Sequence, residues 1–193
     1  GGAFWEFGQP DWERTKLFVM FGVAEDHDSN PIKIGLGKLK ARGCRVIGVN
    51  PIRTGYNAIA DDWLGITPGT DGLLILSLIH CLLQAGKIDL DYLARWTNAP
   101  LLVNNAEGAE KGLILKNAES QPFVIDKRTG MPAPWDGAGV QPDLGAVWQG
   151  HRTVFQHMAE RYLSPDYAPE NVSKRCGIPA ARIHALAAEL ADV

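Results

Sequence analysis

Apolar and polar positions occur along the chain in blocks that indicate alternating strands and helices. Residues 17–21 form an uninterrupted apolar run, which is typical of a strand buried on both faces of a parallel sheet. After a polar loop, residues 32–42 carry apolar side chains at helical spacing, and Gly43 is suited to end that helix. Residues 44–49 form the next strand. Together these segments predict a right-handed βαβ unit.

A long apolar helix is predicted at residues 71–85, with Gly86 at its end. Its polar exceptions lie three and four residues apart and form one thin stripe: Ser77, His80 and Gln84. The remaining predicted elements are a short stretch near 58–63, a strand at 101–103, a hairpin around 123–131, and helices at 152–163 and 179–190. The fold class predicted from this order is α/β.

Composition narrows the class of protein without naming a function. The chain has 193 residues, of which 46% are hydrophobic and 21% charged, so it can bury a core and is neither disordered nor a coiled coil. We expect residues 1–193 to form a single domain. The net charge is −3 with scattered Lys and Arg, which argues against a protein that coats nucleic acid.

The cysteines and the start of the chain exclude several kinds of site. Cys44, Cys81 and Cys176 are widely spaced without a C-x-x-C pair, so we expect core residues and no zinc, iron–sulfur or disulfide site. No apolar stretch reaches the ~18 residues that a membrane span needs. The first residues carry no targeting signal and no initiating Met, so we expect a piece of a longer protein whose compartment is unknown.

Three loops are candidates for ligand binding because of where an α/β sheet places them. In an open parallel sheet, ligands bind beyond the carboxyl ends of the strands. The loops after Phe21 and Val49 leave the sheet at that edge, and residues 67–71 lead into a helix N-terminus, where backbone N–H groups attract phosphates. We therefore consider a nucleotide as the ligand of these loops.

A nucleotide in these loops needs three kinds of group. Arg53 is the candidate for holding phosphates, and Gly22 and Gly69 allow close approach of the backbone. A carboxylate selects guanine by accepting from its N1–H and 2-amino groups. The candidate carboxylates are Asp71, Asp26 and Glu25.

Each candidate also has an ordinary structural interpretation. Asp71 is equally suited to capping its helix, and Arg53 to an exposed surface position. Trp63, just ahead of the third loop, suits either packing or stacking. The G-x-G at Gly35 and Gly37 lies inside a predicted helix, so an NAD-binding domain is not indicated, and no P-loop sequence occurs. The five histidines have no metal-ligand spacing, and His80 suits a core position.

Five segments, taken in order, resemble the DMSO reductase family of molybdopterin oxidoreductases, which includes formate dehydrogenases and nitrate reductases. They are Phe-Gly-Val-Ala-Glu-Asp-His-Asp-Ser-Asn-Pro at 21–31, Val-Asn-Pro-Ile-Arg-Thr at 49–54, Ala-Ile-Ala-Asp at 58–61, Pro-Gly-Thr-Asp at 68–71 and Cys-Gly-Ile-Pro-Ala at 176–180. The resemblance also covers a short helix at 89–97. These segments keep the order and spacing of the family over nearly the whole chain.

The resemblance implies a Rossmann-like parallel sheet flanked by helices as a three-layer sandwich, and a role in binding molybdopterin guanine dinucleotide. The cofactor would be a bis-molybdopterin guanine dinucleotide with molybdenum or tungsten, and this chain would hold the guanosine and pyrophosphate of one pterin. Ala24 stands where the family often has Asn, and Asn50 replaces its usual Asp. The implied cofactor-binding residues are Gly22, Ala24, Glu25, Asp26, Asn30, Asn50, Pro51, Arg53, Thr54, Gly69 and Asp71.

The resemblance also implies groups that lie outside the printed sequence. The cysteines of a [4Fe–4S] cluster and the protein ligand to the metal are expected before Gly1, so we expect no turnover from this chain alone. The implied partners are other domains of the same catalytic polypeptide, an electron-transfer subunit, and a small-molecule substrate, with no nucleic acid. Two alternatives stay open: a stand-alone nucleotide-binding α/β module without redox activity, and a structural domain that has lost its ligand.

Overall fold

The computed structural model describes residues 11–22, 32–53 and 55–193, and their contacts form two compact units. The first, called here the α/β unit, comprises the chain up to Leu82 together with Pro165–Val193. The second, called here the inserted unit, comprises Leu83–Ser164. The assignment of residues 1–193 to one cofactor-binding domain stays a prediction.

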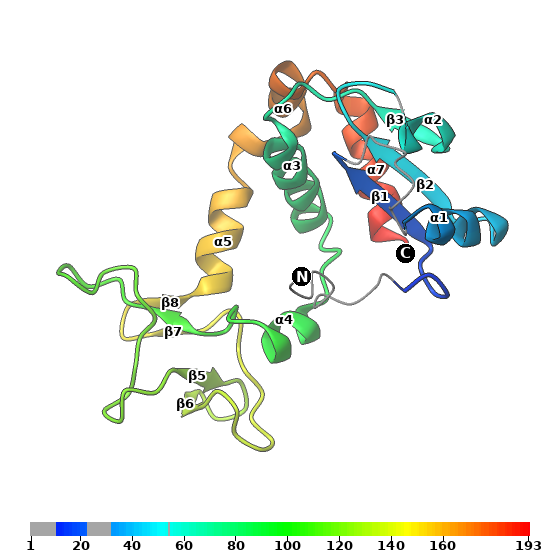
Figure 1. Cartoon of the computed structure of the whole chain (residues 1–193). Coiled ribbons are helices and arrows are strands. Elements are labelled where there is room, and N and C mark those ends of the chain that lie inside the picture. The colour runs from blue at the N-terminus through cyan, green and yellow to red at the C-terminus, as the bar shows by residue number, and fades with distance from the viewer. Residues whose placement is uncertain (1–10, 23–31, 54) are drawn as a thin grey trace, which may run out of the picture. The chain divides into compact units, whose positions relative to one another are not determined.

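A three-stranded parallel sheet forms the centre of the α/β unit (Figure 1). The order is β1 (Leu17–Phe21), β2 (Arg45–Val49) and β3 (Asp62–Leu64), with β2 in the middle. Phe21 pairs with Val49, and Val49 with Leu64, so the three strands end level with one another. The predicted strands at 17–21 and 44–49 are confirmed, and β3 lies at the end of the stretch predicted near 58–63.

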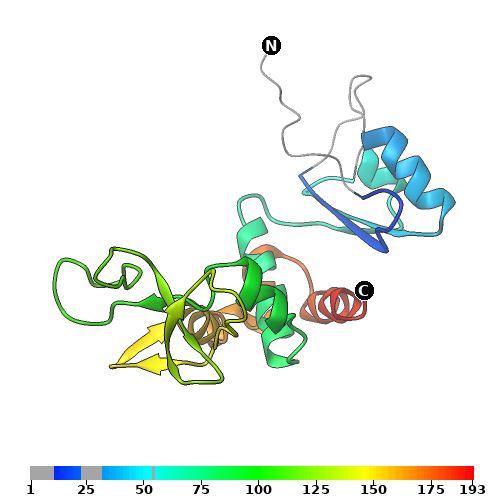
Figure 2. The same cartoon turned by 90° about the horizontal axis from the view of Figure 1, so that it is seen from below.

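Helices cover both faces of this sheet (Figures 1 and 2). One face packs on α1 (Ile32–Ala41) and α2 (Tyr56–Ile59), and the other on α3 (Asp71–Gln84), α6 (Pro169–Cys176) and α7 (Ala180–Ala191). The side chains of β1 alternate between the two faces, as strand geometry requires. The predicted Rossmann-like three-layer α/β fold is confirmed.

Two glycines make room for large side chains against the sheet layers. A Cβ atom on Gly35, inside α1, would lie 2.5 Å from the Trp12 ring, so a glycine in this helix serves packing. A Cβ atom on Gly48, inside β2, would lie 2.0 Å from Asn57 Oδ1 of α2. Asn57 is fully buried, and it packs directly onto the strand backbone.

Helix α3 is buried differently from the predicted pattern. Ser77 and His80 of the predicted polar stripe are buried, whereas Gln84 is exposed and Ile75 keeps 43% of its surface accessible. His80 occupies the core position that the sequence suggested. Within the described ranges, no helix is both long and apolar enough to cross a lipid bilayer.

The inserted unit is built from short antiparallel strands and two helices. Strand β8 pairs with both β4 and β7, while β5 and β6 form the predicted hairpin. The elements are α4 (Leu90–Trp96), β4 (Leu102–Val103), β5 (Phe123–Asp126), β6 (Met131–Pro134), β7 (Val147–Trp148), β8 (His151–Thr153) and α5 (Val154–Tyr162). A 3₁₀ turn at Pro165–Tyr167 begins the return to the α/β unit.

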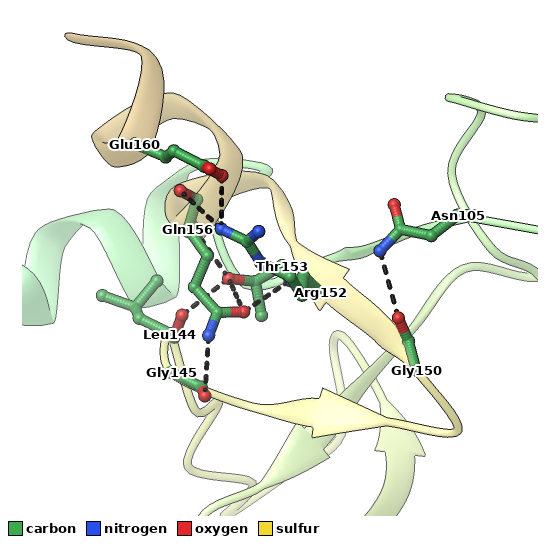
Figure 3. Close-up of polar contacts among 8 residues, drawn as sticks. All are labelled: Asn105, Leu144, Gly145, Gly150, Arg152, Thr153, Gln156 and Glu160. Carbon is green, nitrogen blue, oxygen red and sulfur yellow. Dashed lines mark hydrogen bonds and ion pairs between the residues drawn. The ribbon is translucent and has the colours of Figure 1, made fainter. Parts of the chain in front are cut away.

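A capping box fixes the start of α5 (Figure 3). The Thr153 hydroxyl accepts from the Gln156 N–H at 3.2 Å and donates to the Leu144 carbonyl at 2.6 Å. The Gln156 side chain accepts from the Thr153 N–H at 2.9 Å. These bonds satisfy amides that have no partner within the helix, so α5 begins at Val154 and the preceding residues are free to form β8.

Candidate functional site

The loops that follow the three parallel strands leave the sheet at one edge. The Gly22 N–H donates to the Val49 carbonyl at 3.0 Å, and the Asn50 N–H donates to the Leu64 carbonyl at 3.2 Å. These bonds continue the parallel pairing one residue beyond each strand. The structure therefore brings two of the predicted site residues, Gly22 and Asn50, to neighbouring positions at the carboxyl edge.

The loop after β2 is fixed to the loop after β3 through Trp63. The indole N–H of Trp63 donates to the Asn50 carbonyl at 3.0 Å. A Cβ atom on Gly65 would lie 2.8 Å from the Trp63 ring, so the indole packs closely over that glycine. Asn50 is only 5% exposed as a result of its position at the strand end. Of the two roles that the sequence left open for Trp63, the structure shows packing.

Residues 67–70 form a type II β-turn directly before α3. The Thr70 N–H donates to the Thr67 carbonyl at 3.2 Å, Pro68 occupies the second position, and Gly69 has φ +80° at the third. The Thr70 hydroxyl donates to the same carbonyl at 2.7 Å. Among the described residues, no atom lies within 4 Å of a Cβ atom placed on Gly69, so they leave the backbone of this turn accessible.

The turn is anchored to a distant part of the sequence. The Thr67 N–H donates to the Cys176 carbonyl at 2.8 Å, where α6 ends. Gly177 follows with φ +78°, and a Cβ atom there would lie 3.1 Å from Thr67 Oγ1. The sequence indicated Cys176 and Gly177 as part of a matching segment but gave no sign of this role. The Pro68–Gly69 pair was the signal for the turn, but a partner so far along the chain leaves no local pattern.

Asp71 and Arg53 occupy positions suited to binding a charged ligand. Asp71 is the first residue of α3, half-buried, and beside helix N–H groups that have no intrahelical partner. Its carboxylate forms no hydrogen bond with another described residue, so a capping role for this side chain is not seen. Arg53 and Pro51 are exposed in the loop after β2. The other predicted site residues lie outside the described ranges: Ala24, Glu25, Asp26, Asn30 and Thr54.

Asp61, the last residue of a segment that resembles the family, lies away from this edge. Its carboxylate accepts from Lys40 Nζ at 2.8 Å and from the Val46 N–H, also at 2.8 Å, near the amino end of β2. The hydrogen bond from Lys40, followed by that from Val46, holds the pKa of Asp61 below its ordinary value. Asp61 therefore connects α1 to the sheet and is a structural residue in this arrangement.

The chain is similar to curated molybdenum enzymes along most of its length. It is 40% identical to a sulfite dehydrogenase subunit of Allochromatium vinosum, over 98% of this chain and 21% of that protein. It is 26% identical to the nitrate reductase alpha chain of Bacillus subtilis, over 82% of this chain and 14% of that protein. The chain thus spans about a fifth of the length of these relatives or less. No protein-family model matches it.

A solved structure supports the same grouping at the level of fold. Acetylene hydratase from Pelobacter acetylenicus superposes with a TM-score of 0.56 at 18% identity, over 91% of this chain and 16% of that one. Its likeness is to the fold alone, while the sequence likeness extends over the strands, the edge loops and the inserted unit. The chain belongs to the DMSO reductase family of molybdopterin oxidoreductases.

Proposed function

We propose that this chain holds the guanosine and pyrophosphate of one molybdopterin guanine dinucleotide within a molybdenum or tungsten oxidoreductase. The single observation that carries this function is the level ending of β1, β2 and β3, where the Gly22 and Asn50 hydrogen bonds hold the first two loops against the neighbouring strands. That edge is where open parallel sheets bind nucleotides. The bound metal would supply two-electron chemistry for a small substrate.

The groups at this edge fit a guanine dinucleotide in their chemistry. Arg53 supplies a permanent positive charge for phosphate oxygens, and the first N–H groups of α3 supply donors together with the positive end of the helix dipole. The Asp71 carboxylate supplies two acceptor oxygens that match the adjacent N1–H and 2-amino donors of guanine. Asn50 supplies an amide for hydroxyl groups of a ribose.

Open backbone at two glycines also suits a large ligand. Gly22 has φ +70° and Gly69 has φ +80°, and no atom of the described residues lies within 4 Å of the position that a Cβ would take on either. The described part of the chain therefore leaves the backbone of both turns accessible. We extend the same role to Pro51, Thr54, Ala24, Glu25, Asp26 and Asn30, and we expect the full-length enzyme to carry a [4Fe–4S] cluster and to act with an electron-transfer subunit.

The test is cofactor retention by the full-length polypeptide. Asp71→Ala removes both proposed acceptors for guanine, and loss of hydrogen bonds to a charged group weakens binding by about 1.5–3 kcal/mol, or roughly ten- to a hundredfold. We expect the purified variant to contain much less guanine nucleotide and metal per polypeptide than wild type. Arg53→Ala is expected to act in the same direction through the pyrophosphate.

Asp91→Ala is the matched control. Asp91, like Asp71, is a carboxylate in the first turn of a helix, but it is exposed and lies in the inserted unit, on α4. It should leave guanine nucleotide and metal at wild-type amounts. Wild-type nucleotide content in Asp71→Ala, measured after acid release and chromatography, would contradict the proposed role. Binding of a guanosine nucleotide by a wild-type protein that holds no pterin would instead favour the stand-alone module.

A further inference from the structure

Cys81 differs from the other two cysteines in having an imidazole beside its sulfur. Cys44 and Cys176 are buried, at 7% and 0% exposure, whereas Cys81 is partly exposed on α3. Cys81 Sγ lies 3.9 Å from His184 Nδ1 on α7. Since a thiol and a base within hydrogen-bonding reach form the core of a nucleophilic site, this pair differs from an ordinary core thiol.

A carboxylate on a third helix orients the imidazole. His184 Nε2 lies 2.9 Å from Glu170 Oε1, in the first turn of α6. The hydrogen bond from His184 holds the pKa of Glu170 below its ordinary value, so the carboxylate is ionised and accepts. In a neutral ring the proton therefore sits on Nε2, and the Nδ1 lone pair is left for the Cys81 thiol. All three residues belong to the α/β unit.

The thiol is protonated at neutral pH. Burial, and then the negative charge of Glu170, raise the pKa of the Cys81 thiol above its ordinary value of 9.0. Cys81 is thus not a preformed thiolate, and its reactivity depends on a base that removes the S–H proton as the sulfur attacks. His184 Nδ1 lies close enough to Cys81 Sγ to take this proton, and Glu170 stabilises the imidazolium that results.

We propose that Cys81 is a thiol–disulfide exchange site for small disulfides, with His184 as its general base and Glu170 as the positioning residue. The Cys81 S–H proton passes to His184 Nδ1 while the sulfur attacks one sulfur of the disulfide R–S–S–R. The S–S bond breaks, a Cys81–S–S–R mixed disulfide forms, and the departing thiolate R–S⁻ takes the proton from the imidazolium. One small disulfide is consumed and one small thiol is released, so no other oxidant is needed.

The pH dependence separates this assisted reaction from ordinary thiolate chemistry. The groups that face the site are Glu170 from α6, His184 from α7 and His80 of α3, whose charge also acts on Glu170. A general base takes the proton only in its unprotonated form, so assisted exchange should level off at a pH below the pKa of the thiol. An unassisted thiol would instead react about tenfold faster with each pH unit up to its own pKa, which lies above 9.0.

The experiment treats the full-length polypeptide with 4,4′-dithiodipyridine, a small disulfide whose released thione is followed by absorbance, and maps the modified cysteines by peptide mass spectrometry. At neutral pH we expect Cys81 to react at least about tenfold faster than Cys44 and Cys176, with equal rates after denaturation. His184→Asn should slow Cys81 by about tenfold or more, and Glu170→Gln by a smaller factor. His151→Asn, in the inserted unit, is the matched control and should leave the rate unchanged.

Three results would overturn this role for Cys81. They are a Cys81 rate no higher than that of the buried cysteines, an unchanged rate in His184→Asn, and a wild-type rate that climbs tenfold per pH unit without levelling. Should His184→Asn fail to fold, the wild-type pH profile and Glu170→Gln decide the question, because neither requires loss of the imidazole.

Discussion

Asn57 lies so close to β2 that a Cβ atom at Gly48 would stand 2.0 Å from its Oδ1 atom. Asn57 is fully buried, so its side chain cannot move into solvent to make room. The contact joins α2 to the central strand just before that strand ends at Val49. The identity of residue 48 is thus tied to that of residue 57.

Gly48→Ala should destabilise the α/β unit by about 2–3 kcal/mol, because overpacking a tight core forces side chains and backbone to shift. The measurement is hydrogen exchange of the β2 amides in the full-length polypeptide. In a double variant with Asn57→Ala, the added methyl group has space, so the combined loss should be smaller than the sum of the single losses by about 1 kcal/mol or more. Strictly additive losses would show that the two residues do not interact.

Two glycines on exposed backbone should respond to alanine with opposite signs. Gly37 lies in α1, and a Cβ atom there would have no described neighbour within 4 Å, so Gly37→Ala should stabilise that helix by about 0.5–1 kcal/mol. Gly69 has equal space but φ +80°, and Gly69→Ala should cost about 1 kcal/mol from backbone strain. Exchange rates of the α1 and α3 amides report the two effects separately. A shift of the same sign in both variants would contradict this explanation.

Asp61→Asn should weaken the α/β unit near neutral pH by less than about 1 kcal/mol, since its ion pair with Lys40 is more than a third exposed. The folded-state pKa of Asp61 is lowered, so its stabilisation is fully present above the ordinary value of 3.8 and is lost as pH falls through the lowered pKa. The stability difference between wild type and variant should therefore vanish in strong acid. Urea titrations at neutral and acid pH test this, and a difference that grows in acid would be inconsistent with it.

Thr153→Ala should loosen α5 by about 1–2 kcal/mol, because it removes the cap on the Gln156 N–H and leaves the Leu144 carbonyl without its hydroxyl donor. Thr153→Ser keeps the hydroxyl and is the matched control. Hydrogen exchange in residues 154–158 should speed up in the alanine variant alone. Equal protection in both variants would mean that the capping box contributes nothing measurable.

Local signals in the sequence predicted much of the fold. The apolar run at 17–21, the helical spacing that ends at Gly43 and the apolar helix closed by Gly86 all match elements within a residue or two. Elements whose existence depends on tertiary pairing were harder. Strand β3 has three residues, too few to show alternation, and it is defined by pairing with β2. Helix α6 was not predicted, because its polar sequence has only a narrow apolar face.

The start of α5 is marked by a sequence pattern that the prediction did not use. Thr153 followed three residues later by Gln156 is the capping-box pattern, and it marks the boundary that the structure shows. The candidate site also contains features that were predicted and features that were not. Gly69 and Asp71 were predicted from the Pro-Gly-Thr-Asp sequence, whereas the hydrogen bond from Trp63 to the Asn50 carbonyl depends on two strands that end side by side. No periodicity within either segment contains that information.

The hydrogen bond from Thr67 to Cys176 can form only late in synthesis, because the two residues lie far apart in the sequence. The turn that leads into α3 emerges from the ribosome early, yet its anchor is made only after the whole inserted unit has been translated. A nascent chain that ends at residue 150 contains the three strands but lacks Cys176, whose carbonyl accepts from the Thr67 N–H. Under the proposed function, we therefore expect the cofactor to be loaded only after translation has passed Gly177.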